Sequence, residues 1–235
     1  MIRAGSVLAS TAPLQGASGG SSPTPALQSL IVQPVPIVLA RKLVEKHHYL
    51  HSLPGGTSLA FGVFTGSRLK GCLTLGVGPL NAYSLVDGAT SDDVLTLTRL
   101  WLSDELPKNS ESRFIGIVLR HLRKYTRLKF LVSYADPAQG HLGTIYQATG
   151  WTYTGVSEAM PLYDIGHGQP RHSRSLSHAY GTHSVEHFSR HGINVRLVPQ
   201  QAKYRYVYFL DQTWQGRLKV PQLPYPKREV LNADC

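Results

Sequence analysis

Acidic residues are scarce in this sequence of 235 residues. It has 14 Asp or Glu against 24 Lys or Arg, and the formal net charge is +10 although only 16% of the residues are charged. The excess of positive charge therefore comes from few acids rather than from many bases. Such a chain is attracted to polyanions by electrostatic steering and by counterion release. A nucleic-acid partner is favoured, and a merely basic soluble protein is the plainer alternative.

Cysteine and long apolar runs are also scarce. The two cysteines, Cys72 and Cys235, lie far apart, which excludes a disulfide framework and a cysteine-based zinc site and fits a reducing compartment. Within residues 1–30, no apolar run follows a basic start, so neither a signal peptide nor a membrane span is indicated. We expect a cytoplasmic protein without membrane contact, and its oligomeric state does not follow from the sequence.

Composition divides the chain into three parts. Residues 1–30 are rich in Ser, Ala, Gly, Thr and Pro and are predicted to be a disordered extension. Residues 213–235 have repeated prolines and little periodicity, which is typical of a tail on the surface. The remaining residues, 31–212, are expected to form one domain.

Hydrophobic periodicity in this domain alternates between strand and helix patterns. The expected elements are, in order, a helix at 37–49, hairpin strands at 58–66 and 69–78, a strand at 94–102, a helix at 111–125, a strand at 129–136, a short helix at 143–149, a strand at 151–157 and a last strand at 203–211. This order predicts an α/β or α+β fold. Residues 161–200, which contain six histidines, are expected to be irregular.

Two polar residues stand out within the expected strands. Asp136 ends a buried strand just before Pro137, at the kind of strand end where open α/β sheets place their chemistry; a turn-forming Asp is the alternative. Arg99 lies inside an apolar strand, where an unpaired cation is costly to bury. It is either a fixed cation that holds a carbonyl or phosphate group or an Arg on a solvent-facing side.

The helix at 111–125 combines an apolar stripe with basic residues. Asn109, Ser110 and Ser112 stand at its start, where they either cap the helix or hold an anion at the free backbone N–H groups. The basic residues either contact a nucleic-acid backbone or form a solvated face; they are Arg113, Arg120, Arg123, Lys124 and Arg127. His183, His187 and His191 would share a helical face, either as solvated or DNA-facing histidines or, less favoured, as a zinc site.

Three stretches carry a family resemblance. They read "EKHHYLHSLPGG", "LTRLWLSDELPKNSESRFIG" and "SYADPAQGHLGTIYQATGW", in that order, within residues 36–156. Together they resemble the Mom family of phage DNA-modification proteins, which are divergent GNAT-like acyltransferases. The resemblance implies a GNAT-like catalytic domain over residues 31–212, with a central mixed, mostly antiparallel sheet flanked by helices. It also implies that N6 of adenine in double-stranded DNA receives a carbamoylmethyl (acetamido) group, which protects the DNA from host restriction enzymes in the host bacterial cytoplasm.

The same resemblance implies roles for individual residues. His48 and Tyr49 would face the reaction centre, and Tyr146 would stand where GNAT enzymes protonate their leaving thiolate. Asp136 or His48 would accept the proton from N6, while Arg99 and Ser112 would hold the donor. Imidazole, phenolate and carboxylate groups can also bind iron, so His48, Tyr49 and Asp136 stay open as an iron site.

The donor stays open at this stage. The GNAT pyrophosphate loop is normally rich in glycine, and the matching stretch here is "LPKNSESRFIG". Acetyl-CoA is one alternative, and a glycine-derived activated donor, which would supply the carbamoylmethyl atoms more directly, is the other. Two further functions also remain: a GNAT N-acyltransferase that acts on a protein or small amine, and a non-catalytic DNA-binding protein.

Overall fold

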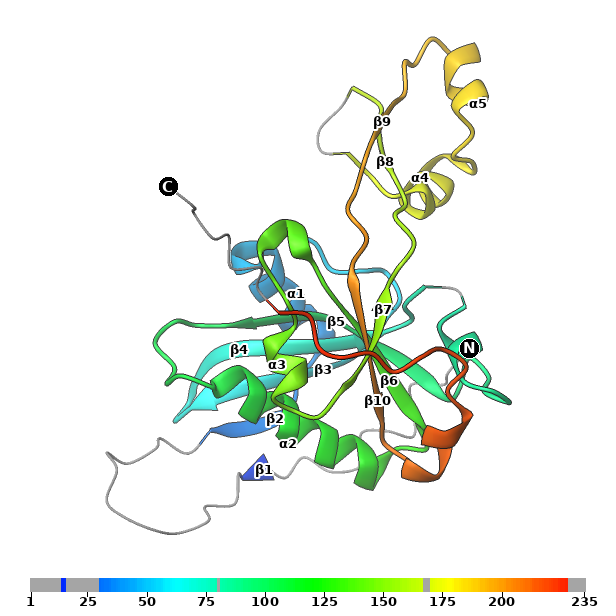
Figure 1. The fold of residues 1–235 in the computed structure, drawn as a ribbon. Helices are drawn as coiled ribbons and strands as arrows, with labels where there is room; N and C mark the ends of the chain where they lie inside the picture. Colours follow the sequence, from blue (N-terminus) through cyan, green and yellow to red (C-terminus); the bar gives the residue numbers. More distant parts are fainter. Residues whose placement is uncertain (1–13, 16–29, 80, 167–169, 228–235) are drawn as a thin grey trace, which may run out of the picture.

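One mixed sheet forms the centre of the molecule (Figure 1). The computed structural model describes residues 14–15, 30–79, 81–166 and 170–227. Its strands run in the order β1-β2-β3-β4-β5-β6-β10-β7, and within this sheet only the neighbours β5 and β6 are parallel. The strands are β1 (Leu14–Gln15), β2 (Ile31–Pro34), β3 (Thr57–Thr65), β4 (Arg68–Gly76), β5 (Val94–Leu102), β6 (Phe130–Ala135), β7 (Thr152–Val156) and β10 (Tyr204–Phe209).

Helices cover both faces of this sheet. Their bounds are α1 (Ile37–His47), α2 (Ser110–Tyr125) and α3 (Thr144–Gln147), with 3-10 turns η2 (Ala82–Leu85), η3 (Pro137–Gln139) and η4 (Gln212–Arg217). Helix α1 packs on Ala60 of β3 and Cys72 of β4. Helix α2 packs on the next residue of each strand, Phe61 and Leu73. Because successive strand residues point to opposite faces, α1 and α2 lie on opposite sides. The predicted GNAT-like fold is confirmed.

The parallel strands β5 and β6 diverge halfway along their length. They pair from Val94↔Phe130 to Leu97↔Ser133, and beyond these residues each strand continues without the other. At this point the register between β4 and β5 shifts between Thr74 and Leu75, which is the irregularity that bends a strand away from its neighbour. The carboxyl ends of the two parallel strands are thus held apart, which is where open α/β sheets bind ligands.

A long insert between β7 and β10 corrects one prediction. Residues 161–200 are not irregular: they contain β8 (Leu162–Asp164), α4 (Ser173–Tyr180), α5 (Val185–Arg190) and β9 (Arg196–Val198). The strands β8 and β9 form an antiparallel ladder of their own. The elements are short, and among the described residues their buried core consists of Ile165, Leu176 and Phe188, with partly buried Tyr163, Ile193 and Val195 packed against it. Few apolar positions are therefore needed, and the sequence shows little hydrophobic periodicity here.

The two chain ends are described only in part. Most of the predicted extension at 1–30 lies outside the described residues, and within it Leu14–Gln15 pairs with β2. After η4 the chain runs across the sheet to β7 (red in Figure 1), where the Leu223 N–H donates to the Tyr153 carbonyl at 2.9 Å. Among the described helices, none combines the length and apolar character needed to cross a bilayer.

Candidate functional site

His48 and Tyr49 follow directly after α1, where the helix ends. Their rings stack with centroids 4.4 Å apart, and the edge of His141 meets Tyr49 with centroids 6.0 Å apart. His48 is 8% exposed and Tyr49 is 41% exposed. The tyrosine therefore offers an open aromatic surface supported from below by a buried imidazole.

The environment of His48 fixes its protonation state. Burial, together with the Arg99 guanidinium and the rings of His141 and His51, lowers the pKa of His48 from 6.5 to about 4. Its Nδ1 accepts a hydrogen bond from the Leu50 N–H at 3.1 Å, so the proton of the neutral ring is on Nε2. His48 is therefore a neutral hydrogen-bond donor and a weak base.

Arg99 lies on β5 just beyond the last residue that pairs with β6. Its Nε donates to the Ser52 carbonyl at 2.9 Å and its Nη1 to the Thr98 carbonyl at 2.7 Å. Burial lowers the pKa of Arg99, although a guanidinium remains protonated in proteins. Among the described residues, no carboxylate forms an ion pair with it. Arg99 is thus a fixed cation whose charge remains available to a ligand.

Asp136 lies at the carboxyl end of β6 and accepts a hydrogen bond from the Ala138 N–H at 3.0 Å. Its Oδ2 pairs with the Lys203 ammonium at 3.3 Å, and the two side chains are 13% and 26% exposed. The carboxylate also raises the pKa of Tyr49, to which burial contributes most. Lys203 is a residue that the sequence analysis missed, since nothing in the sequence indicates that it faces Asp136 across 67 positions.

Tyr146 completes the cluster from inside the protein. It is 6% exposed and packs against Trp151 and Tyr206. Burial raises the pKa of Tyr146 to about 12, with a smaller contribution from Tyr49, and a hydrogen bond with Ser133 opposes the rise. The phenol therefore keeps its proton at neutral pH, so it can donate a hydrogen bond or a proton.

Glycine at position 143 makes the position of Tyr146 attainable. Gly143 has a φ of +77°, and a Cβ there would come within 2.4 Å of the Tyr206 ring. The Tyr206 hydroxyl donates to the Leu142 carbonyl and accepts from the Gln147 amide. These contacts fix α3 against β10, and with it the site of Tyr146.

The residues at the start of α2 were predicted either to cap the helix or to hold an anion, and the Asn109 side chain makes no capping hydrogen bond. Asn109 is exposed in the left-handed conformation, with a φ of +66°. The hydroxyl of buried Ser110 donates to the Pro107 carbonyl at 2.6 Å, and that of Ser112 donates to the Asn109 carbonyl at 3.0 Å. Both serine hydroxyls thus donate hydrogen bonds within the start of the helix, and their oxygens can still accept a hydrogen bond from a ligand. Arg113 has a buried Nη1 without a hydrogen-bond partner among the described residues.

The basic residues of α2 do not gather beside Asp136. Arg123 is used internally, since it donates to the Leu210 carbonyl and to the Tyr208 hydroxyl. Helix α2 runs antiparallel to β6, so its last turn lies about 20 Å from its first, at the end of the sheet away from Asp136. Exposed Arg120, Lys124 and Arg127 could reach DNA only from that part of the molecule.

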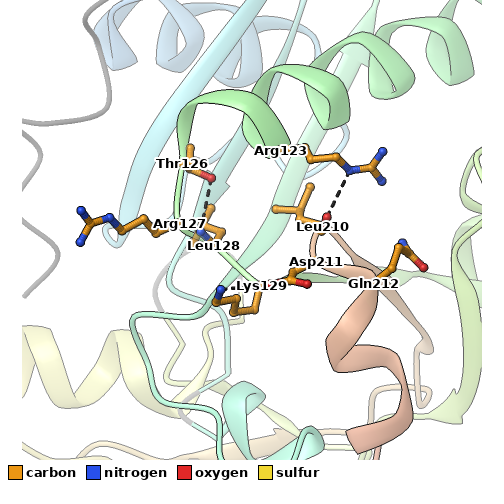
Figure 2. A pocket seen from close by; sticks show the side chains of 8 residues that line it. All are labelled: Arg123, Thr126, Arg127, Leu128, Lys129, Leu210, Asp211 and Gln212. Atoms are coloured by element: carbon orange, nitrogen blue, oxygen red, sulfur yellow. Dashed lines mark hydrogen bonds and ion pairs between the residues drawn. The ribbon is translucent and has the colours of Figure 1, made fainter.

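A cavity of about 380 Å³ opens at this same distant end (Figure 2). Its cations largely have partners: Arg123 bonds Leu210, and Lys129 pairs with Asp211 at 3.1 Å, while Arg127 points away from both (Figure 2). The remaining lining residues include Thr126, Leu128 and Gln212. No member of the cluster around Asp136 lines it, so we do not assign the chemistry to this cavity.

An iron site was left open for His48, Tyr49 and Asp136. Nδ1 of His48 is used by a backbone N–H and Oδ2 of Asp136 by an ammonium. In the described part of the chain, no three His, Cys, Asp or Glu side chains converge on a point that suits a metal ion. The Tyr49 phenolate is not one of these four ligand types, so an iron site that includes it stays a prediction.

The sheet order, the diverging parallel pair and the helix between those two strands define a GNAT-like α/β protein. The model of the Mom protein family matches residues 29–227. The chain belongs to the Mom protein family, as the three sequence stretches predicted.

The chain is similar to a named phage protein and to several solved structures. The chain is 28% identical over 212 residues to the methylcarbamoylase mom of Escherichia phage Mu, with 85% of each chain covered. Similar solved structures include NAA60 of Arabidopsis thaliana in complex with acetyl-CoA, at 10% identity and a TM-score of 0.45, which covers 77% of this chain and 98% of that one. FeeM, an N-acyl amino acid synthase from uncultured soil microbes, has 14% identity and a TM-score of 0.44 over 81% and 95% of the two chains.

Proposed function

We propose that this protein is an enzyme that modifies adenine in double-stranded DNA, attaching a carbamoylmethyl group to N6 and so protecting the DNA from restriction enzymes. The observation that carries the proposal is the cluster where β5 and β6 diverge. It combines the un-neutralised cation of Arg99 with the carboxylate of Asp136 and the open ring of Tyr49. Membership of the Mom family and the name of the phage Mu relative support the same chemistry.

The amine of adenine is a poor nucleophile because its lone pair is delocalised into the ring, so a base must remove a proton as the new bond forms. Asp136 is the proposed acceptor, since His48 is neutral, weakly basic and already protonated on Nε2. His48 instead donates a hydrogen bond within the site. The exposed ring of Tyr49 stacks on the adenine once the base has left the duplex.

The other half of the site holds the donor. The guanidinium of Arg99 binds its carbonyl or phosphate oxygen, and the phenol of Tyr146 donates a proton to the leaving group. The start of α2, with Asn109, Ser110 and Ser112, receives an anionic part of the donor at its backbone N–H groups. The basic residues of α2 stay predicted contacts to the DNA backbone.

The product limits the donor. Transfer of an acetyl group would give an amide on N6, whereas a carbamoylmethyl group is joined through its methylene carbon and ends in an amide. We therefore favour a glycine-derived activated donor whose carboxyl group is already an amide and whose methylene carbon carries the leaving group. The bond from N6 to the methylene carbon forms as the bond from that carbon to the leaving group breaks, and Asp136 takes the N6 proton. Acetyl-CoA alone does not contain the nitrogen of this product.

The test uses the pure protein, duplex DNA and candidate donors or cell extract, followed by digestion to nucleosides and mass spectrometry. We expect Asp136→Asn to lower the modified deoxyadenosine by about 10²–10⁴, the usual contribution of a general base. Asp211→Asn is the matched control, because Asp211 also pairs with a lysine but at the distant end of the sheet.

Each rival function gives a different result. Acyl transfer to protein or small amines without any DNA requirement would indicate an ordinary GNAT N-acyltransferase. Tight DNA binding with no modified nucleoside under any donor condition would indicate a non-catalytic DNA-binding protein. In cells, loss of restriction resistance in Asp136→Asn but not in Asp211→Asn would support the enzyme.

A further inference from the structure

The insert between β7 and β10 is a separate small unit, which we call the arm and define as residues 157–203. Its core of Ile165, Leu176 and Phe188 is distinct from the cores around the central sheet. Figure 1 shows it standing clear of the sheet, with α4 and α5 beside the β8–β9 ladder. A unit that adds little to the main core and projects from it is suited to contact something outside the protein.

The base of the arm lies beside the candidate site. The Ser157 N–H donates to the Lys203 carbonyl at 2.8 Å, and the Lys203 N–H donates to the Ser157 hydroxyl at 3.0 Å. The side chain of the same lysine pairs with Asp136 at 3.3 Å. These contacts fix the start of the arm relative to Asp136, so a ligand bound by the arm has a defined position relative to that carboxylate.

The arm has the polar character of a surface that binds polyanions. Residues 157–203 include five Lys or Arg, three Asp or Glu, and six of the 11 histidines of the chain. Arg171 and Arg190 are exposed. Two of the three acids are engaged within the arm: Asp164 pairs with Arg196, and Glu186 accepts from the Ser184 hydroxyl. The exposed guanidinium groups of Arg171 and Arg190 and the exposed imidazoles of His178 and His187 can donate to phosphate oxygens.

We propose that the arm docks on the DNA duplex beside the target adenine and holds its phosphate backbone; this inference rests on the proposed function. Residues 157–164 lead outward from the point where the arm joins the main sheet. If extended, they span at most about 27 Å. This length corresponds to about eight base pairs at 3.4 Å each. The arm thus contacts the flanking duplex while the flipped adenine occupies the candidate site around Asp136, where the arm joins the sheet.

The experiment measures the affinity of the full chain for duplex DNA as a function of salt. In Arg171→Gln/Arg190→Gln, we expect the slope of log K against log salt to fall by about 0.9 for each cation that contacts a phosphate, with roughly eightfold weaker binding per contact at 0.1 M salt. The matched control is Arg217→Gln/Lys219→Gln, two exposed cations on and just after η4, at the far end of β10.

A second variant guards against simple misfolding. Glu158→Lys adds a cation at the exposed base of the arm and should tighten binding by a similar factor, which a damaged arm would not do. Unchanged slopes in both arm variants would overturn the proposal. So would a slope that falls only in Arg120→Gln/Arg127→Gln, on α2 and just after it, or arm variants that change RNA binding and leave duplex binding unaltered.

The two levels of the proposal fail separately. If the wild-type protein modifies deoxyadenosine and the arm variants bind DNA equally well, the docking inference is wrong and the proposed function stands. If no donor yields a modified nucleoside but binding depends on the arm, the proposed reaction is wrong and docking stands.

Discussion

The buried imidazole of His48 makes the stability of the protein depend on pH in a defined window. Its pKa is lowered from 6.5 to about 4 in the folded state, so the unfolded chain binds a proton there more readily than the folded one. Stability therefore rises with pH between these two values. The contribution is fully present above about pH 6.5, is lost progressively as the pH falls, and is absent below about pH 4.

The size of the effect follows from the shift. Between neutral pH and about pH 4.5, a group with these two pKa values costs about 2.5 kcal/mol of unfolding free energy. The site opens to solvent on the side of Tyr49, which is 41% exposed, and this solvent screens part of the interaction. We therefore expect a loss of roughly 1–1.5 kcal/mol from His48 alone.

Urea unfolding of the wild type and of His48→Gln at about pH 7 and pH 4.5 isolates this contribution. The glutamine keeps an acceptor for the Leu50 N–H but does not titrate, so the variant should lose about 1–1.5 kcal/mol less than the wild type on acidification. His191→Gln, at an exposed histidine of the arm, should behave as the wild type. Equal losses in the wild type and His48→Gln would refute the assignment of His48 as a buried neutral ring.

Two further predictions concern packing. Gly143→Ala should lower the free energy of unfolding by about 2–4 kcal/mol, because a side chain is strained at positive φ and the new methyl meets the Tyr206 ring; a change below about 0.5 kcal/mol would contradict the packing described. Phe188→Ala removes the largest side chain of the three-residue arm core and should cost about 3–5 kcal/mol locally. Limited proteolysis should then cut within residues 157–203 while the main unfolding transition stays in place; a fall in that transition would mean that the arm and the sheet unfold together.

The sequence predicted six of the eight described strands of the main sheet because their patterns are strong, whereas the short β1 and β2 were not predicted. Strand β5 begins and ends at the residues expected, 94 and 102, and α2 begins one residue early at Ser110. Each has a run of apolar residues at a single period long enough to identify it. The arm was wrongly expected to be irregular because α4 and α5 are short and their core of Leu176 and Phe188 involves only a few apolar positions.

The candidate site was predicted as separate residues rather than as an arrangement. His48, Tyr49, Arg99 and Asp136 were each singled out, and the structure brings them together. The ion pairs of the site join residues that lie far apart in the sequence. They depend on which strands pair, and a single sequence does not contain that information. For that reason the pairing of Asp136 with Lys203 was not predicted.

The segment after η4 has a consequence for the self-association of the protein. Strand β7 is the outermost strand on its side of the sheet, and an uncovered edge of this kind invites pairing with another chain. The Leu223 N–H occupies the Tyr153 carbonyl, and the Tyr225 hydroxyl occupies the Trp151 carbonyl at 2.8 Å. The proline-rich segment thus acts as a built-in cap against edge-to-edge aggregation, and its prolines, which lack an N–H, prevent it from offering a new edge in turn.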